Sequence, residues 1–183
     1  MLGLDVQLCL MLENELEKSK NKNATVISTV EASLCVRETA EGRNAKIKIV
    51  PVGSLFVAEE LKRSNAVFGG EPCGEYIFSD GLPAADGILA GLKFVELFCK
   101  KGKLSHLASR IKTYPMRRAK FPCENGKKQS SLEKIKAKLA PVLPGKINAI
   151  DGIRIDADDY WLPIRPSGTE PFMRLTCEAR SES

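Results

Sequence analysis

The sequence is poor in two residue types on which common chemistries depend. His106 is its single histidine, and aromatic residues make up only 6% of the chain. One histidine, in a short segment of helical character, gives a Ser-His-Asp triad no support, so we expect His106 to be solvated or packed. Base stacking needs aromatic side chains, and their scarcity therefore argues against a nucleic-acid-binding surface.

The cysteines form no recognisable framework. They include no Cys-x-x-Cys pair and no histidine-rich neighbourhood, which argues against a zinc site or a small disulfide scaffold and predicts reduced thiols. The six cysteines stand at positions 9, 35, 73, 99, 123 and 177.

Long hydrophobic runs are absent too. Residues 1–12 are apolar, but they contain Asp5 and have neither a basic start nor a small-residue cleavage site, so they do not resemble a signal peptide. No run is long enough to span a bilayer. We expect a cytoplasmic protein without a membrane partner.

What the sequence does have is a modest positive charge. The net charge is +5, from 28 basic and 23 acidic residues. This excess suits an anionic ligand but is below the basic density of a dedicated nucleic-acid binder. A chain of 183 residues holds one large domain or two small ones.

Helical and strand patterns alternate over residues 1–112, which predicts a βαβ-type α/β domain with a mixed sheet and flanking helices. In the longest expected helix, 84–101, apolar residues recur every three to four positions. Gly42 suits the C-terminal cap of the earlier helix 33–41. The recurring residues are Ile88, Leu92, Val95 and Phe98. The expected helices cover 4–16, 33–41, 55–63, 84–101 and 104–111, and the expected strands cover 24–30, 46–52, 65–68 and 76–78.

Tyr114-Pro115 marks the expected domain boundary, and residues 113–183 predict a smaller α+β domain with an antiparallel sheet. The aspartates at 156–159 invite a metal-binding interpretation. A charged hairpin tip is favoured, because no glycine or distal glutamate completes a Ca²⁺ loop. The expected elements are a strand at 117–123, an amphipathic helix at 130–139, and a hairpin of 149–155 and 160–164.

The most informative stretch is the loop Arg165–Pro171, which lies between two strand-like segments. A guanidinium matches phosphate oxygens bidentately, and hydroxyls and backbone N–H groups add further donors. Gly168 is expected to let the backbone turn and approach an anion closely. The alternative is a tight hairpin turn with an exposed arginine. We favour a phosphate-binding loop formed by Arg165, Ser167, Gly168 and Thr169.

A second glycine-rich loop, residues 69–75, carries Glu71 and Glu75 four positions apart, with Cys73 between them. Carboxylates accept hydrogen bonds, so a pair of them suits the vicinal hydroxyls of a sugar. Two alternatives stay open. One is a surface turn with solvated acids, and the other is a glycosidase acid/base pair, which needs a carboxyl separation of roughly 5–9.5 Å.

The two loops resemble those of the α-D-phosphohexomutases, the family of phosphoglucomutase, phosphomannomutase and phosphoglucosamine mutase. Arg165–Pro171 resembles the phosphate-binding loop of their last domain. Residues 69–75 resemble the sugar-binding loop of their third domain, usually Gly-Gly-Glu-x-Ser-Gly-His, with Cys73 in place of Ser and Glu75 in place of His. The segment Pro72–Glu75 is similar to that of archaeal-type phosphoglucosamine mutases. Pro51–Gly53 and Asp151-Gly152 also resemble their family counterparts.

The resemblance implies that residues 1–112 and 113–183 correspond to the third and fourth mutase domains. The phosphoserine and Mg²⁺ motifs of the family belong to its first two domains, and neither occurs in this sequence. We therefore expect this chain to bind a phosphosugar, to hold no catalytic residue and no metal, and to be inactive without a separate N-terminal half. Mg²⁺ would serve the complete enzyme. The resemblance assigns sugar hydroxyls to Glu71, Cys73 and Glu75, and phosphate to Arg165, Ser167, Gly168 and Thr169.

Two other functions stay open. The chain could be a non-catalytic phosphosugar-binding or regulatory module, which a neighbouring gene carrying the serine and metal motifs would argue against. Less favoured is a basic α+β domain that binds nucleic acid, with steeply salt-dependent affinity.

Overall fold

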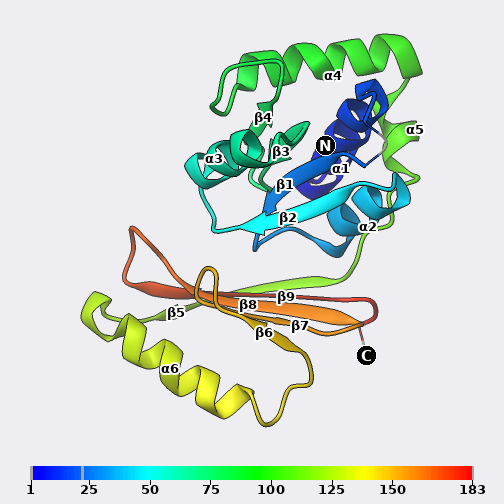
Figure 1. Cartoon of the computed structure of the whole chain (residues 1–183). Coiled ribbons are helices and arrows are strands. Elements are labelled where there is room, and N and C mark those ends of the chain that lie inside the picture. Colours follow the sequence, from blue (N-terminus) through cyan, green and yellow to red (C-terminus); the bar gives the residue numbers. More distant parts are fainter. Residues whose placement is uncertain (1, 22, 183) are drawn as a thin grey trace. The chain divides into compact units, whose positions relative to one another are not determined.

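The computed structural model describes residues 2–21 and 23–182 (Figure 1). The chain divides between Thr113 and Tyr114 into two compact units. The sequence places the domain boundary one residue earlier, between positions 112 and 113. Unit 1 contains a mixed sheet with its helices, and unit 2 contains an antiparallel sheet with one long helix.

Unit 1 is built on a four-stranded mixed sheet, sheet A, in the order β2-β1-β3-β4. β1 pairs in parallel with β2 and with β3, and β4 returns antiparallel to β3. β-branched residues dominate the central strand β1, with Ser28 as the exception, as expected for a strand buried on both faces. The strands are β1 Thr25–Thr29, β2 Lys46–Val50, β3 Phe68–Gly70 and β4 Tyr76–Phe78. The mixed sheet with flanking helices confirms the α/β prediction.

Helices pack on both faces of sheet A. A Cβ added at Gly69 would meet Val57 of α3, whereas one added at Gly70 would meet Leu8 of α1. Because neighbouring strand residues point to opposite faces, α3 and α1 cover opposite sides of the sheet. α4 and α5 pack on α1 through an apolar cluster that includes Leu97 and Leu107. The helices are α1 Leu4–Lys18, α2 Leu34–Gly42, α3 Ser54–Ser64, α4 Gly87–Lys101 and α5 Leu104–Ala108.

A buried lysine fixes the orientation of α4. Lys93 Nζ lies 2.9 Å from Glu15 Oε2 of α1 and 3.2 Å from Asp80, and it sits 4.5 Å from the centre of the Phe78 ring. Both Lys93 and Glu15 are buried. Turning α4 about its axis would break this buried ion pair and leave the Glu15 carboxylate with the longer Lys18 contact at 3.6 Å, which is destabilising.

Several helix ends differ from the expectation, and two of the differences have a clear cause. α4 begins at Gly87 rather than near residue 84, because the Asp86 carboxylate caps it by accepting a hydrogen bond from the Leu89 N–H at 2.8 Å. Gly42 is the last residue of α2 and not its cap, so that prediction is wrong. The left-handed conformation falls instead on Asn44, with φ 56°, and asparagine tolerates it better than most residues.

Unit 2 is a five-stranded antiparallel sheet, sheet B, in the order β5-β9-β8-β7-β6, with α6 along one face (Figure 1). Leu132 of α6 lies in one apolar cluster with Ile153, Ile164 and Met173 of the sheet. This arrangement confirms the predicted α+β fold. The elements are β5 Met116–Pro122, the 3₁₀ turn η1 Asn125–Lys127, α6 Lys128–Leu139, β6 Lys146–Asn148, β7 Ile153–Asp156, β8 Tyr160–Pro166 and β9 Phe172–Ala179.

Candidate functional site

The loop between β8 and β9 is closed by its own hydrogen bonds. The Ser167 N–H donates to the Phe172 carbonyl at 2.9 Å, and the Glu170 N–H donates to the Ser167 hydroxyl at 3.2 Å. Ser167 is buried, whereas Gly168 and Thr169 are exposed. The Ser167 oxygen therefore supports the turn while its own O–H stays a possible donor, and the outer edge of the loop consists of Gly168 and Thr169.

Lys128, the first residue of α6, holds this loop from one side. Its ammonium donates to the carbonyls of Ser167 at 2.6 Å and Glu170 at 2.8 Å. No local sequence pattern indicates this role, because Lys128 precedes Ser167 by 39 positions and only the packing of α6 on sheet B brings the two together.

Three cations form a row on sheet B beside the loop. Arg165 of β8 is directly opposite Arg174 of β9, which in turn is directly opposite Lys120 of β5. Directly opposite residues share one face of a sheet. Ile164 and Met173, which precede Arg165 and Arg174 in the sequence, belong to the apolar cluster that α6 packs on. The row therefore lies on the face that α6 does not cover.

Each arginine of the row has a carboxylate partner. Arg165 Nε lies 3.1 Å from Asp151 Oδ2, and Arg174 Nη2 lies 2.6 Å from Glu170 Oε2. The contact with Asp151 uses Nε and not the two Nη groups of Arg165. It orients the guanidinium in a way that still allows the Nη groups to meet a phosphate. The sequence pointed to the Asp151-Gly152 stretch without giving this contact.

Two positions near the row, Gly152 and Gly168, differ in whether the backbone there requires glycine. Gly152 has φ +74°, and a Cβ there would lie 2.3 Å from the Ile164 carbonyl oxygen, so only glycine lets β7 and β8 approach at this point. Gly168 has no such φ, and a Cβ there would meet nothing within 4 Å. The expectation that the turn needs the conformational freedom of Gly168 is wrong. Its lack of a side chain leaves open space outside the loop.

The loop between β3 and β4 is a tight turn. β3 includes Gly69 and Gly70, so the strand starts and ends later than the expected 65–68. The Gly74 N–H donates to the Glu71 carbonyl at 3.0 Å, and the Glu71 N–H donates to the Glu75 carbonyl at 2.9 Å. Gly74 has φ +95°, which glycine adopts without strain.

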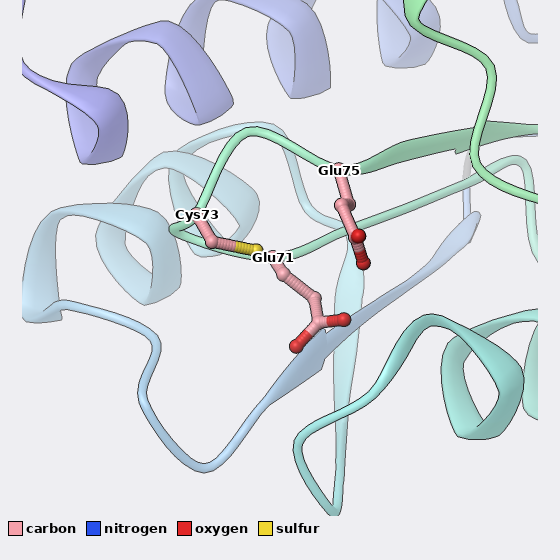
Figure 2. Close-up of side chains that lie close together, drawn as sticks. All are labelled: Glu71, Cys73 and Glu75. Atoms are coloured by element: carbon pink, nitrogen blue, oxygen red, sulfur yellow. The ribbon is translucent and has the colours of Figure 1, made fainter.

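This turn brings the three predicted sugar-binding side chains together. Figure 2 shows Glu71, Cys73 and Glu75 close to one another on the loop. One polar atom of each lies within 4.8 Å of those of the other two.

Glu71 and Glu75 have different environments. Glu71 is 3% exposed, and its Oε2 accepts a hydrogen bond from the Gly53 N–H, at the start of α3, at 3.1 Å. The positive end of the α3 dipole favours a carboxylate at this position. Glu75 is exposed. The solvated-turn alternative is therefore wrong for Glu71, and the sequence pointed to Pro51–Gly53 without revealing the contact.

Cys73 stands between Glu71 and Glu75 in the sequence, and its side chain is exposed. Partial desolvation of the thiol, together with the negative charges of Glu71 and Glu75, raises its pKa above the usual value. The neutral thiol therefore prevails near pH 7, and it is a poor ligand for Mg²⁺, which demands octahedral oxygen coordination. These three residues fit the recognition of hydroxyl or amine donors better than the binding of magnesium.

The remaining candidates from the sequence lie outside these loops. His106 is exposed on α5. In the aspartate-rich hairpin, Asp156 pairs with Arg154 at 2.7 Å, and Asp158 and Asp159 are exposed. These observations agree with a solvated His106 and with a charged hairpin tip at 156–159. Across residues 2–21 and 23–182, no helix combines the length and the apolar character that crossing a membrane requires.

Comparison with protein-family models identifies both units. The model for the phosphoglucomutase/phosphomannomutase α/β/α domain III matches residues 5–114, and the model for the C-terminal domain matches residues 119–183. The chain belongs to the phosphoglucomutase/phosphomannomutase family. Its members are isomerases, and the two units correspond to the third and the C-terminal domain of the family fold.

Similar proteins agree with this assignment. The chain is 42% identical over 165 residues to a probable phosphoglucosamine mutase of Methanosarcina barkeri, covering 90% of this chain and 37% of that protein. It is 38% identical over 162 residues to a probable phosphoglucosamine mutase of Pyrococcus abyssi, covering 86% and 35%. The chain thus spans little more than a third of the length of these curated relatives.

The fold has solved counterparts. The crystal structure of a phosphoglucomutase/phosphomannomutase family protein from Burkholderia thailandensis matches 97% of this chain and 38% of its own, with a TM-score of 0.82 and 22% sequence identity. An N-acetylphosphoglucosamine mutase of Aspergillus fumigatus matches 97% of this chain and 39% of its own, with a TM-score of 0.61 and 12% identity. At these identities the likeness concerns the fold.

Proposed function

We propose that this chain is the C-terminal, phosphosugar-binding part of a hexose-phosphate mutase, and that its sugar is an amino sugar phosphate. The choice of sugar follows the relatives named probable phosphoglucosamine mutases. The observation that carries the binding function is the row of Arg165, Arg174 and Lys120 beside the Ser-Gly-Thr loop. The row gathers three positive charges beside hydroxyl and backbone N–H donors, a combination that suits a phosphate dianion.

The two loops would divide the recognition of the ligand. Arg165 binds two phosphate oxygens through its Nη groups, while the Ser167 and Thr169 hydroxyls and the backbone at Gly168 add donors. Glu71, Cys73 and Glu75 contact the sugar, with the carboxylates accepting hydrogen bonds from its hydroxyl or amino groups. Holding both ends of a substrate promotes phosphoryl transfer, because that reaction depends on positioning and on charge stabilisation.

The chemical step would depend on the domains that this sequence does not contain. The family resemblance assigns the phosphoserine and the Mg²⁺ ligands to those domains, and we propose no catalytic residue and no magnesium ligand in this chain. Magnesium bound there would stabilise charge on the transferred phosphoryl group. We also propose a cytoplasmic location, in line with six cysteines that all stay free thiols.

Restoring the missing part tests this function. The segment of the Methanosarcina barkeri relative that precedes its matched region would be fused to this chain, giving the completed chain. We expect the completed chain to interconvert glucosamine 1- and 6-phosphates, with Mg²⁺ and a bisphosphate primer, at roughly 1–10³ s⁻¹. The chain alone should give no turnover, and Arg165→Ala in the completed chain should lower it.

Two results would contradict the proposal. Full turnover by the chain alone would show that it contains the chemical machinery. A completed chain that binds the phosphosugar and turns over none, beside an active full-length relative, would favour a non-catalytic binding module.

A further inference from the structure

Two buried thiols meet between α1 and α2. Cys9 of α1 and Cys35 of α2 are 26 positions apart in the sequence, yet their Sγ atoms lie 3.5 Å apart. Both side chains are buried, whereas Cys73 and Cys99 are exposed. Because a thiol is a weak hydrogen-bond donor, the packing of the two helices, and not this bond, brings the sulfurs together. The pair lies outside the loops 69–75 and 165–171.

The surroundings of Cys35 stabilise negative charge on its sulfur. The Cys9 S–H donates to Cys35 Sγ, and the Ser33 O–H also donates to it, at 3.1 Å. Ser33 is the N-cap of α2, so Cys35 stands in the first turn, at the positive end of the helix dipole. Nucleophilic cysteines are found in surroundings of this kind, because the attacking species is the thiolate.

Cys9 has the complementary role of a thiol that keeps its proton. Its hydrogen bond to Cys35 and its burial raise the pKa of the Cys9 thiol above the usual value. Cys9 is therefore neutral near pH 7 and remains the donor of the pair. Of the two sulfurs, Cys35 is suited to attack an oxidant and Cys9 is suited to react second.

A surface pocket of about 230 Å³ reaches Cys35 from outside. A water molecule takes up about 30 Å³ of liquid, so the pocket has room for an oxidant of a few heavy atoms. All of its lining residues belong to unit 1, and they come from α1, from α2 and its C-terminal end, and from the segment after α5. They are Glu13, Cys35, Glu38, Thr39, Gly42, Arg43, Arg110, Ile111 and Lys112.

We propose that Cys9 and Cys35 form a reversible redox site, which a hydroperoxide oxidises to a disulfide and a dithiol reduces again. Cys35 Sγ first attacks one peroxide oxygen. An S–O bond forms, the O–O bond breaks, and with hydrogen peroxide the leaving oxygen departs as water, taking up the thiol proton. Cys9 Sγ then attacks the sulfur of the resulting sulfenic acid. The S–S bond forms, the S–O bond breaks, and the hydroxide leaves with the Cys9 proton as a second water.

The disulfide is compatible with the packing of the two helices. The sulfurs would have to approach from 3.5 Å to the bond length of about 2.05 Å. The bond would tie α1 to α2 and restrict the unfolded chain between them, so the oxidised protein should be the more stable one. A reducing compartment keeps the pair as thiols, and disulfides that form there are usually transient and redox-sensing.

Oxidation of this chain with hydrogen peroxide, followed by alkylation and peptide mass spectrometry, tests the site. We expect a linked peptide that contains Cys9 and Cys35, reversal by dithiothreitol, and a melting temperature of unit 1 at least about 5 °C higher after oxidation. Cys9→Ala should stop at a Cys35 sulfenic acid that dimedone traps, and Cys35→Ala should leave Cys9 as a thiol. Cys99→Ala, at an exposed cysteine, is the control and should leave the link intact.

Three results would overturn the proposal. One is oxidation confined to the exposed cysteines, with Cys9 and Cys35 both recovered as alkylated thiols. Another is an equal yield of the Cys9–Cys35 link in urea, since the folded geometry would then contribute nothing. The third is a sulfenic acid on Cys9 in Cys35→Ala, which would contradict the assigned order. If an alanine variant fails to fold, the linked peptide of the parent chain decides. None of these measurements needs phosphosugar binding or turnover, so they stand apart from the test of the proposed function.

Discussion

Arg165 and Arg174 lie directly opposite each other in the β8–β9 ladder, and each guanidinium pairs with a different carboxylate, Asp151 and Glu170. The two carboxylates offset the repulsion between these like charges, and a bound dianion would add a second, shared partner. Because a ligand that binds only the folded state stabilises it, anion binding should be measurable as a rise in melting temperature.

Arg165→Ala should weaken binding of inorganic phosphate and of hexose phosphate at least tenfold. The reason is that a hydrogen bond to a charged group contributes about 1.5–3 kcal/mol. Calorimetry on this chain would measure the affinities, and phosphate should raise the melting temperature of the parent more than that of the variant. Arg117→Ala, an exposed arginine on the same strand as Lys120 but on the other face, is the control and should change neither. Equal affinity for parent and Arg165→Ala would exclude this role.

Glu71→Gln should weaken hexose-phosphate binding to the completed chain about tenfold and leave inorganic phosphate unaffected. The amide keeps the size and one acceptor of the carboxylate, but it loses the charge that strengthens hydrogen bonds from sugar hydroxyls. Glu75→Gln makes the same change at an exposed position of the same loop. Comparing the two losses of hexose-phosphate affinity shows how much the burial of Glu71 contributes. Unchanged hexose-phosphate affinity in Glu71→Gln would mean that the carboxylate serves contacts within the fold, such as the one with the Gly53 N–H, and not the sugar.

Gly152→Ala should destabilise unit 2 by at least about 2 kcal/mol. The positive φ is strained for alanine, and its Cβ would overlap the Ile164 carbonyl. Gly168→Ala, which meets open space, should change stability by no more than about 0.5 kcal/mol. Chemical denaturation followed by Trp161 fluorescence would compare the two. Similar losses of unfolding free energy in the two variants would show that β7 and β8 can move apart enough to admit a Cβ at position 152.

Cys73 should react with alkylating reagents more slowly at pH 7 than an ordinary exposed thiol. Its raised pKa lowers the thiolate fraction, so the midpoint of the rate against pH should lie above the usual value of about 8.5. Glu75→Gln removes one of the nearby negative charges and should move the midpoint toward lower pH. A midpoint below that of a free cysteine would contradict the assigned environment.

Much of the fold follows from local patterns in the sequence. The period of the apolar residues predicts the long helices of both units, and the β-branched run at β1 predicts a buried central strand. The mixed and antiparallel sheets follow from the order of these elements. Helix ends were less predictable, because the choice between Gly42 and Asn44 depends on a single residue's backbone conformation.

The parts that local patterns could not give are contacts between distant positions. Asp151 meets Arg165 only because β7 pairs with β8, and the Gly53 N–H meets Glu71 only when α3 and β3 pack together. The 82% exposure of Ile88 on α4 was equally hidden. Apolar periodicity identifies a helix, but the ion pair of Lys93 decides which face turns inward, and that pair joins residues 78 positions apart.

The grip of Lys128 on the carbonyls of Ser167 and Glu170 has a thermodynamic consequence. A loop that is already fixed before its ligand arrives loses little conformational entropy on binding. Association at this loop should therefore be fast and should show no slow rearrangement phase. Lys128→Met would leave the sequence of the 165–171 loop unchanged but would remove the ammonium that fixes it. The anion would then have to order the loop on binding, which makes the entropy of binding less favourable.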